Sequence, residues 1–88
     1  MGFALAERAW GQGLGVETVR AAQYLAFGEL ELHRLWAARA PLNYASERTL
    51  LRAGFVEEGR IREHVLVRGK WRDSITYSSL ASEWKAPN

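Results

Sequence analysis

The sequence predicts an α/β fold in which the chain runs strand, helix, strand, helix, strand, strand. Three observations support this order. A glycine-rich stretch at 11–15 precedes apolar residues at helical spacing, a second helical segment ends at Gly54, and the last third alternates as β-strands do. The 88 residues allow one domain at most, and a content of 48% hydrophobic residues predicts a packed core.

The first half of the chain predicts two strands that flank one helix. Residues 3–6 form a short apolar run, and the polar stretch 7–15 follows as a loop. From Leu14 to Phe27 apolar residues recur at the spacing of an amphipathic helix. The apolar-rich segment 33–40 predicts the second strand, which Pro41 ends.

The second half predicts a helix followed by a β-hairpin. Asn43 is a suitable N-cap for a helix that reaches Ala53, and Gly54 is a suitable stop. Segments 55–67 and 71–80 alternate around Arg68-Gly69-Lys70, which predicts two antiparallel strands joined by a short turn.

Composition excludes several classes of site and partner. The chain has no cysteine, so disulfides, thiolate metal sites and a covalent cysteine intermediate are excluded. His33 and His64 have no partner at metal-ligand spacing, and no metal is expected. The 12 basic residues are scattered among 10 acidic ones, which disfavours nucleic acid as a partner. No apolar run suits a signal peptide or a membrane span, so we expect no membrane partner and a cytoplasmic location.

The stretch Trp10-Gly11-Gln12-Gly13-Leu14-Gly15 is the segment most suggestive of chemistry. Its alternating glycines let the backbone approach a ligand closely, and the following helix start leaves amide N–H groups unpaired. Together these features predict a phosphate or pyrophosphate site. A Walker loop would need Gly-Lys-Ser/Thr where the chain has Gly15-Val16-Glu17, and a dinucleotide fingerprint would need glycine at position 16. Neither a nucleoside triphosphate nor NAD is therefore favoured.

This stretch resembles the Gln/Arg-x-x-Gly-x-Gly/Ala loop of the GNAT N-acetyltransferase superfamily, whose amides hold the pyrophosphate of coenzyme A. One register starts at Trp10, in place of Gln or Arg, and a second starts at Arg8. The Asn-x-x-Ser pattern at 43–46 and the Gly-Phe pair at 54–55 are similar to the subgroup that acetylates the N-termini of ribosomal proteins.

The resemblance implies that residues 1–88 are the acetyl-CoA-binding, C-terminal half of the GNAT fold, with a mixed sheet. It implies transfer of acetyl from acetyl-CoA, the cosubstrate, by direct attack of an amine, either a protein N-terminus or a small amine. Many members of the family place a proton-donating tyrosine four residues before the glycine that corresponds to Gly54, where this chain has Leu50. The resemblance implies Ser46 as the substitute catalytic residue. The cofactor-binding residues implied are Trp10, Gly11, Gln12, Gly13, Leu14, Gly15, Val16, Asn43 and Ser46.

Alternatives stay open at this point. Asn43 also fits a plain helix cap, and Ser46 fits an exposed helix serine. Arg48 and Arg52 lie four apart and suit either the 3′-phosphate of the cofactor or solvent. The general base is undetermined among Glu57, Glu58, Glu63 and Asp73.

Two other functions compete with the enzyme. The chain could be a truncated, non-catalytic coenzyme-A-binding module, or an unrelated α/β protein that binds other macromolecules and uses the glycine loop only as a tight turn. The exposed edge of the first strand also predicts pairing with a second copy, which would give a homodimer.

Overall fold

The computed structural model describes residues 2–5, by their backbone alone, and residues 15–85. They form a four-stranded sheet in the order β1-β2-β4-β3. β1 (Gly2–Leu5) runs parallel to β2 (Arg34–Arg39), whereas β4 (Lys70–Leu80) is antiparallel to both β2 and β3 (Val56–Val67). The predicted order of elements and the mixed sheet are therefore confirmed.

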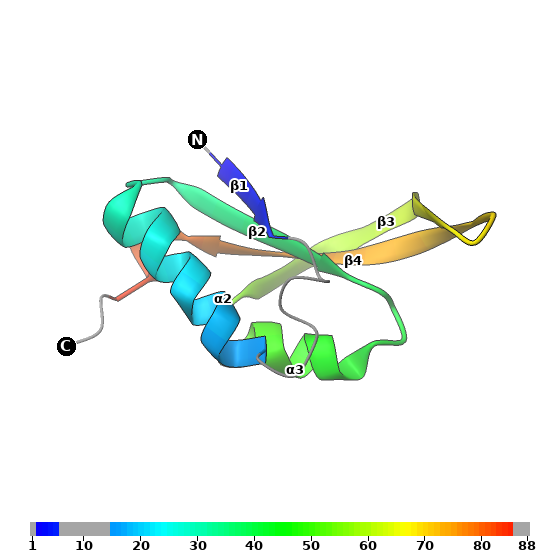
Figure 1. The fold of residues 1–88 in the computed structure, drawn as a ribbon, viewed down its shortest axis with the longest axis horizontal. Coiled ribbons are helices and arrows are strands. Elements are labelled where there is room, and N and C mark those ends of the chain that lie inside the picture. Colours follow the sequence, from blue (N-terminus) through cyan, green and yellow to red (C-terminus); the bar gives the residue numbers. More distant parts are fainter. Residues whose placement is uncertain (1, 6–14, 86–88) are drawn as a thin grey trace.

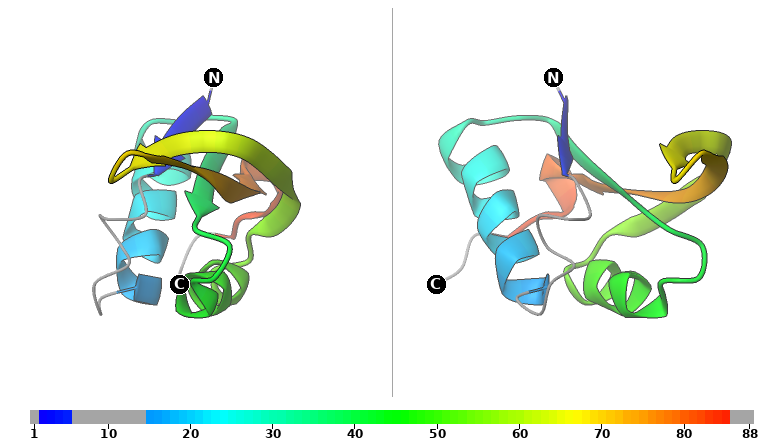
Figure 2. Two further views of the ribbon diagram at one scale, coloured as in Figure 1. Left: turned by 90° about the vertical axis from the view of Figure 1, so that its right-hand side faces the viewer. Right: turned by 45° about the vertical axis from the view of Figure 1, so that its right-hand side comes forward.

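Both main helices cover the same face of this sheet (Figures 1 and 2). α2 (Gly15–Gln23) continues into the π-helical η1 (Tyr24–Glu29), so helical winding extends past the expected end at Phe27. α3 (Tyr44–Arg52) lies beside α2, and the short η2 (Ala81–Glu83) follows β4. Within residues 2–5 and 15–85 no helix is long and apolar enough to cross a membrane.

The ends of α3 follow the expected capping chemistry. Asn43 has φ −88° and lies outside the helix, and its Oδ1 accepts a hydrogen bond from the backbone N–H of Ser46 at 3.2 Å. Beyond the helix Gly54 has φ +84°, a left-handed conformation that glycine adopts without strain. The first turn of α3 is therefore fixed in position relative to Asn43.

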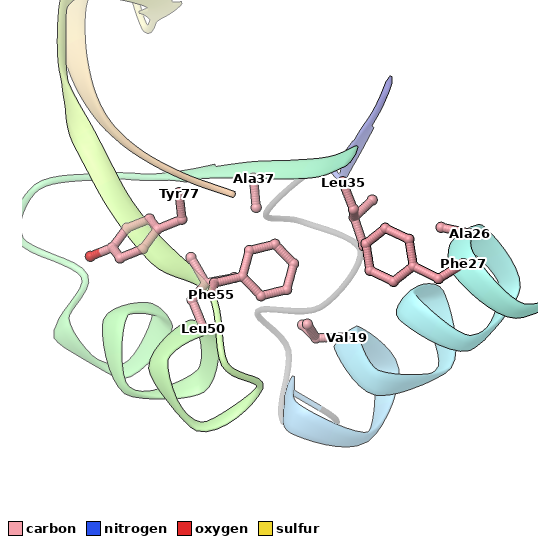
Figure 3. Packing of buried hydrophobic residues seen from close by; sticks show 8 residues of the cluster. All are labelled: Val19, Ala26, Phe27, Leu35, Ala37, Leu50, Phe55 and Tyr77. Carbon is pink, nitrogen blue, oxygen red and sulfur yellow. The ribbon is translucent and has the colours of Figure 1, made fainter. Parts of the chain in front are cut away.

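The hydrophobic core lies between the sheet and the two helices (Figure 3). Along β2 the buried residues alternate with partly exposed ones, as expected for a strand with one covered face. Leu50 of α3 and Tyr77 of β4 are fully buried. The buried apolar residues are Val19, Ala26, Phe27, Leu35, Ala37, Leu50, Phe55 and Tyr77.

The β3–β4 hairpin extends past both helices (Figure 1). Arg68 and Gly69 form its turn with φ +50° and +78°, the positive values that type I′ turns require. The register of β3 shifts twice, between Glu57 and Gly59 and between Ile61 and Val65. Because neither α2 nor α3 covers the outer part of the hairpin, several large apolar side chains there stay exposed, namely Ile61, Val65, Leu66, Val67 and Trp71.

Candidate functional site

The start of α2 lies directly against α3. Gly15 is the first residue of α2, and a Cβ added there would be 3.0 Å from Oγ1 and 3.3 Å from Cγ2 of Thr49. A larger residue at this position would require the Thr49 side chain to move by a few tenths of an ångström. Gly15 and Val16 are thus placed at the helix N-terminus, where unpaired backbone N–H groups favour an anion. The other predicted loop residues, Trp10, Gly11, Gln12, Gly13 and Leu14, lie outside the described residues.

The first turn of α3 carries Asn43 and Ser46. Ser46 is 3% exposed, which overturns the alternative of a solvent-exposed helix serine. Among residues 15–85 no hydrogen bond engages its hydroxyl, whereas its backbone N–H is held by Asn43. The side chains of Ser46 and Leu50 are both buried, one helical turn apart. A buried hydroxyl without such a partner is suited to donate a hydrogen bond or a proton to a bound ligand.

A buried arginine joins this turn to the sheet. Arg39, at the end of β2, is 5% exposed. Its Nη2 donates to Oε2 of Glu47 at 2.7 Å, and its Nη1 donates to the carbonyl oxygens of Ala40 and Pro41 at 3.2 and 2.8 Å. Its Nε donates to the Tyr77 hydroxyl at 2.9 Å. All three guanidinium nitrogens are therefore satisfied, as a buried charge requires.

The Tyr77 hydroxyl, which accepts a hydrogen bond from Arg39, links this arginine to β3. Its hydroxyl donates to Oε1 of Glu57 at 3.2 Å. Burial raises the pKa of Tyr77, against the opposing effect of the hydrogen bond from Arg39. The phenol is thus neutral near pH 7, and the Glu57 carboxylate, one of the candidate bases, accepts its proton in a hydrogen bond.

A second polar cluster lies at the register shift of β3. The backbone N–H of Glu63 and Nε of Arg60 donate to the Asp73 carboxylate at 2.9 and 2.7 Å. These two hydrogen bonds lower the pKa of Asp73. Nδ1 of His64 lies 2.8 Å from Oγ of Ser74, which is 5% exposed. This pair could not be predicted from the sequence, because regular alternation does not bring these two side chains together.

A hollow lies at the C-terminal end of α3. It has a volume of about 360 Å³, and its walls include the basic side chains of Arg20, Arg52 and Lys85. Arg20 also reaches the carbonyl oxygen of Arg52 at 3.4 Å. Of the two arginines proposed for the 3′-phosphate, only Arg52 lines this hollow, and Arg48 does not. Among residues 2–5 and 15–85 no three His, Asp or Glu side chains gather as a metal site would need.

Comparison with known proteins identifies the same family on independent grounds. The model of the acetyltransferase (GNAT) domain matches residues 1–56. Over 73 residues the chain is 41% identical to a probable N-acetyltransferase, YjcK, of Bacillus subtilis (strain 168), covering 83% of this chain and 40% of that protein. It is 30% identical over 84 residues to the ribosomal protein uS5-alanine N-acetyltransferase of Escherichia coli (strain K12), covering 96% of this chain and 43% of that protein.

Solved structures show the same fold. The crystal structure of the ribosomal-protein-S5-alanine acetyltransferase of Vibrio fischeri superposes with a TM-score of 0.76 at 29% sequence identity. The superposition covers 94% of this chain and 49% of that one. The chain thus spans less than half the length of these three relatives.

Proposed function

The chain belongs to the GNAT acetyltransferase family, and from this premise we propose that it binds acetyl-CoA and supplies the donor-binding part of an N-acetyltransferase. The observation that carries the proposal is the contact between Gly15 and Thr49, which brings the α2 N-terminus beside the helix that bears Asn43 and Ser46. An acetyl-CoA site needs a helix start that can bind phosphate and a hydroxyl group that is available to the ligand. The α2 N-terminus and the Ser46 hydroxyl, which has no described partner, have these two properties.

The residues present fit the cosubstrate. The pyrophosphate would be held by the backbone N–H groups of the loop 10–14 and of Gly15 and Val16 at the helix start. Asn43 and Ser46 would contact the pantetheine arm, and Arg52, joined now by Arg20, would meet the 3′-phosphate. Acetyl-CoA supplies the activated acetyl group, and no metal is required for its transfer.

The reaction we propose is direct attack of an amine on the thioester. The amine nitrogen forms a bond to the acetyl carbon, the carbon–sulfur bond breaks, and the leaving thiolate takes a proton. Backbone N–H groups near residues 3–5 would stabilise the negative charge on the carbonyl oxygen. Ser46 is the proposed proton donor to sulfur, because its hydroxyl is buried and has no hydrogen bond within residues 15–85.

The acceptor class proposed is a protein N-terminus or a small amine. The E. coli and V. fischeri relatives carry the name of a ribosomal-protein alanine N-acetyltransferase, which favours a protein N-terminus that begins with alanine. We further propose a cytoplasmic location and no nucleic-acid or membrane partner, since the basic and acidic residues are intermixed along the chain.

A non-catalytic coenzyme-A-binding module is the second candidate. Its support is Leu50, which stands where many members of the family carry the proton-donating tyrosine. Such a module would bind acetyl-CoA and release no thiol.

Calorimetric titration with acetyl-CoA tests the donor site. We expect micromolar binding by the 88-residue chain and a loss of about tenfold or more in affinity for Gly13→Asp, since a carboxylate beside the pyrophosphate repels it. Leu66→Asp adds the same charge at an exposed position of β3, outside the hollow proposed for the 3′-phosphate, and should bind like the wild type. A folded chain that binds no acetyl-CoA, or a Gly13→Asp variant that binds as tightly as the wild type, would refute the proposed site. Release of free thiol in the presence of an amine separates the enzyme from the binding module.

A further inference from the structure

The outer part of the β3–β4 hairpin, residues 62–72, carries a charge that the proposed function does not use, and we call this segment the hairpin arm. It extends past both helices (Figure 1). It holds one acidic residue, Glu63, and four exposed cations, namely Arg62, Arg68, Lys70 and Arg72. The ion pairs found within residues 2–5 and 15–85 include none of these four cations. The hairpin arm therefore presents an excess of positive charge to solvent.

Asp73 borders the hairpin arm, but its charge is already paired. Its carboxylate accepts hydrogen bonds from the backbone N–H of Glu63 at 2.9 Å and from Nε of Arg60 at 2.7 Å. These two hydrogen bonds lower the pKa of Asp73, so the carboxylate is ionised near pH 7. Along the sequence Asp73 interrupts the basic residues, whereas in the structure it is held by Arg60 and leaves the cations of the hairpin arm unpaired.

The strand register places aliphatic side chains directly beside two of these cations. Val65 lies opposite Arg72, and Val67 lies opposite Lys70. Residues that lie opposite each other on antiparallel strands share one face of the sheet. The two valines are 41% and 45% exposed. One face of the hairpin arm therefore combines apolar and positively charged groups, and we call it the valine–cation face.

The valine–cation face lies on the side of the sheet away from the helices. Tyr77 of β4 enters the core, and side chains alternate along a strand, so Lys70 and Arg72 point to the opposite side. Leu66 and Trp71, which lie opposite each other, occupy the other face of the hairpin arm. Neither α2 nor α3 covers the valine–cation face (Figure 2). It is therefore open to a partner.

We propose that the valine–cation face binds an acidic segment of another protein. Carboxylates of this segment accept charge-assisted hydrogen bonds from Lys70 and Arg72, and its aliphatic side chains cover Val65 and Val67. The positive charge sets the sign of the partner's charge, and the valines require that the partner also carries apolar groups. The inference goes beyond the proposed function, because the proposed acetyl-CoA site lies at the α2 N-terminus on the other side of the sheet.

Other partners fit this face less well. Two copies of the chain would bring like charges together. Single-stranded nucleic acid binds through cations and aromatic rings on one surface, but Trp71 points to the face opposite Lys70 and Arg72. Insertion of the hairpin tip into a membrane would bury the charged side chain of Arg68. An acidic protein segment is therefore the favoured partner.

Calorimetric titration of the 88-residue chain with synthetic peptides tests the proposed surface. The probe is a peptide of glutamate and leucine whose leucines lie on one helical face. We expect a Kd of about 10 to 100 μM. Binding should weaken about fivefold when salt is raised from about 0.05 M to about 0.5 M, because salt screens the charges. Poly-glutamate, which lacks apolar groups, should bind at least about fivefold more weakly, and a peptide of lysine and leucine should not bind.

Matched substitutions test which residues form the surface. Arg72→Glu should weaken binding of the glutamate–leucine peptide by about tenfold or more, because it places a carboxylate against those of the peptide. Arg48→Glu makes the same change of charge at an exposed position of α3 and should bind as the wild type does. Val67→Asn removes an apolar contact and should weaken binding about threefold. All three positions are exposed, so the circular dichroism spectra should match that of the wild type.

The outcomes separate this surface from other partners and from the proposed function. Equal effects of Arg72→Glu and Arg48→Glu, or equal affinity for poly-glutamate and the glutamate–leucine peptide, would overturn the proposal. Tighter binding of single-stranded RNA or of vesicles that contain phosphatidylserine would also overturn it, as would loss of self-association in Val67→Asn, which would assign the face to a second copy. A chain that binds acetyl-CoA but not the peptide would overturn this inference and leave the proposed function standing.

Discussion

The charged side chain of Arg39 is buried, and this is tolerated because every guanidinium nitrogen donates a hydrogen bond. Its partners come from the following turn, from α3 and from β4, so one side chain joins three parts of the chain. Glu47, which it binds, is the residue after Ser46. The position of the Asn43–Ser46 turn relative to the sheet therefore depends on this arginine.

We expect Arg39→Met to lower the free energy of unfolding by about 2 to 3 kcal/mol, because the Glu47 carboxylate and the buried Tyr77 hydroxyl lose the hydrogen bonds that Arg39 donates. Arg39→Lys keeps the charge but not the fork of donors, and should cost less. Urea unfolding measures both variants. Arg60→Met is the matched control, because Arg60 pairs with Asp73 on the surface, where solvent screens the charges, and its loss should cost far less than that of Arg39. Equal losses for Arg39→Met and Arg60→Met would contradict the role assigned to Arg39.

At the scale of elements, the packing of α2 on α3 also restricts the size of the side chain at position 15. The sequence suggested that its small size serves the approach of a phosphate. In the structure a Cβ at this position would press on the adjacent Thr49 side chain, whose hydroxyl donates a hydrogen bond to the Ala45 carbonyl oxygen. Helix contact and ligand binding therefore restrict the same residue.

A double-mutant cycle separates these two restrictions. Gly15→Ala should destabilise the chain by about 1 kcal/mol, since overpacking outweighs the gain in helix propensity. In a Thr49→Ala background, which removes the contact, the same change should be neutral or stabilising. Thermal or urea unfolding of the four chains measures this coupling. Equal effects of Gly15→Ala in both backgrounds would show that the helix contact does not restrict this position.

At the scale of the whole molecule, two surfaces have no cover in the described part of the chain. β1 is the end strand of the sheet and pairs with β2 alone. The outer hairpin exposes large apolar side chains, among them Trp71 at 58% exposure. A strand edge and an apolar surface both favour association.

We expect the 88-residue chain to form a homodimer, as the strand edge predicted. Sedimentation velocity over a range of concentrations should show a species of twice the 10.0 kDa chain mass. Backbone pairing and apolar contact are insensitive to screening, so raised salt should leave the dimer intact. A folded species that stays monomeric at every concentration would refute the dimer, and dissociation in salt would indicate an interface between charged side chains instead.

The sequence by itself determined the element order, the cap at Asn43, the stop at Gly54 and a short turn within 68–70, which the structure narrows to Arg68 and Gly69. Each of these depends on local periodicity or on the backbone preferences of a few adjacent residues. The glycine loop and the Asn-x-x-Ser segment also predicted the family that the comparisons then showed.

Only the tertiary structure decided the partners of Arg39, the contact of Gly15 with Thr49, the burial of Ser46 and the pairing of His64 with Ser74. Arg39 and Tyr77, like Gly15 and Thr49, are distant in sequence, and the pairing of His64 with Ser74 depends on a bulge that breaks the regular alternation of β3. Local preferences fix which residues form a helix or a strand. Which side chains then meet is set by strand register and by the approach of the helices, and both are properties of the assembled fold.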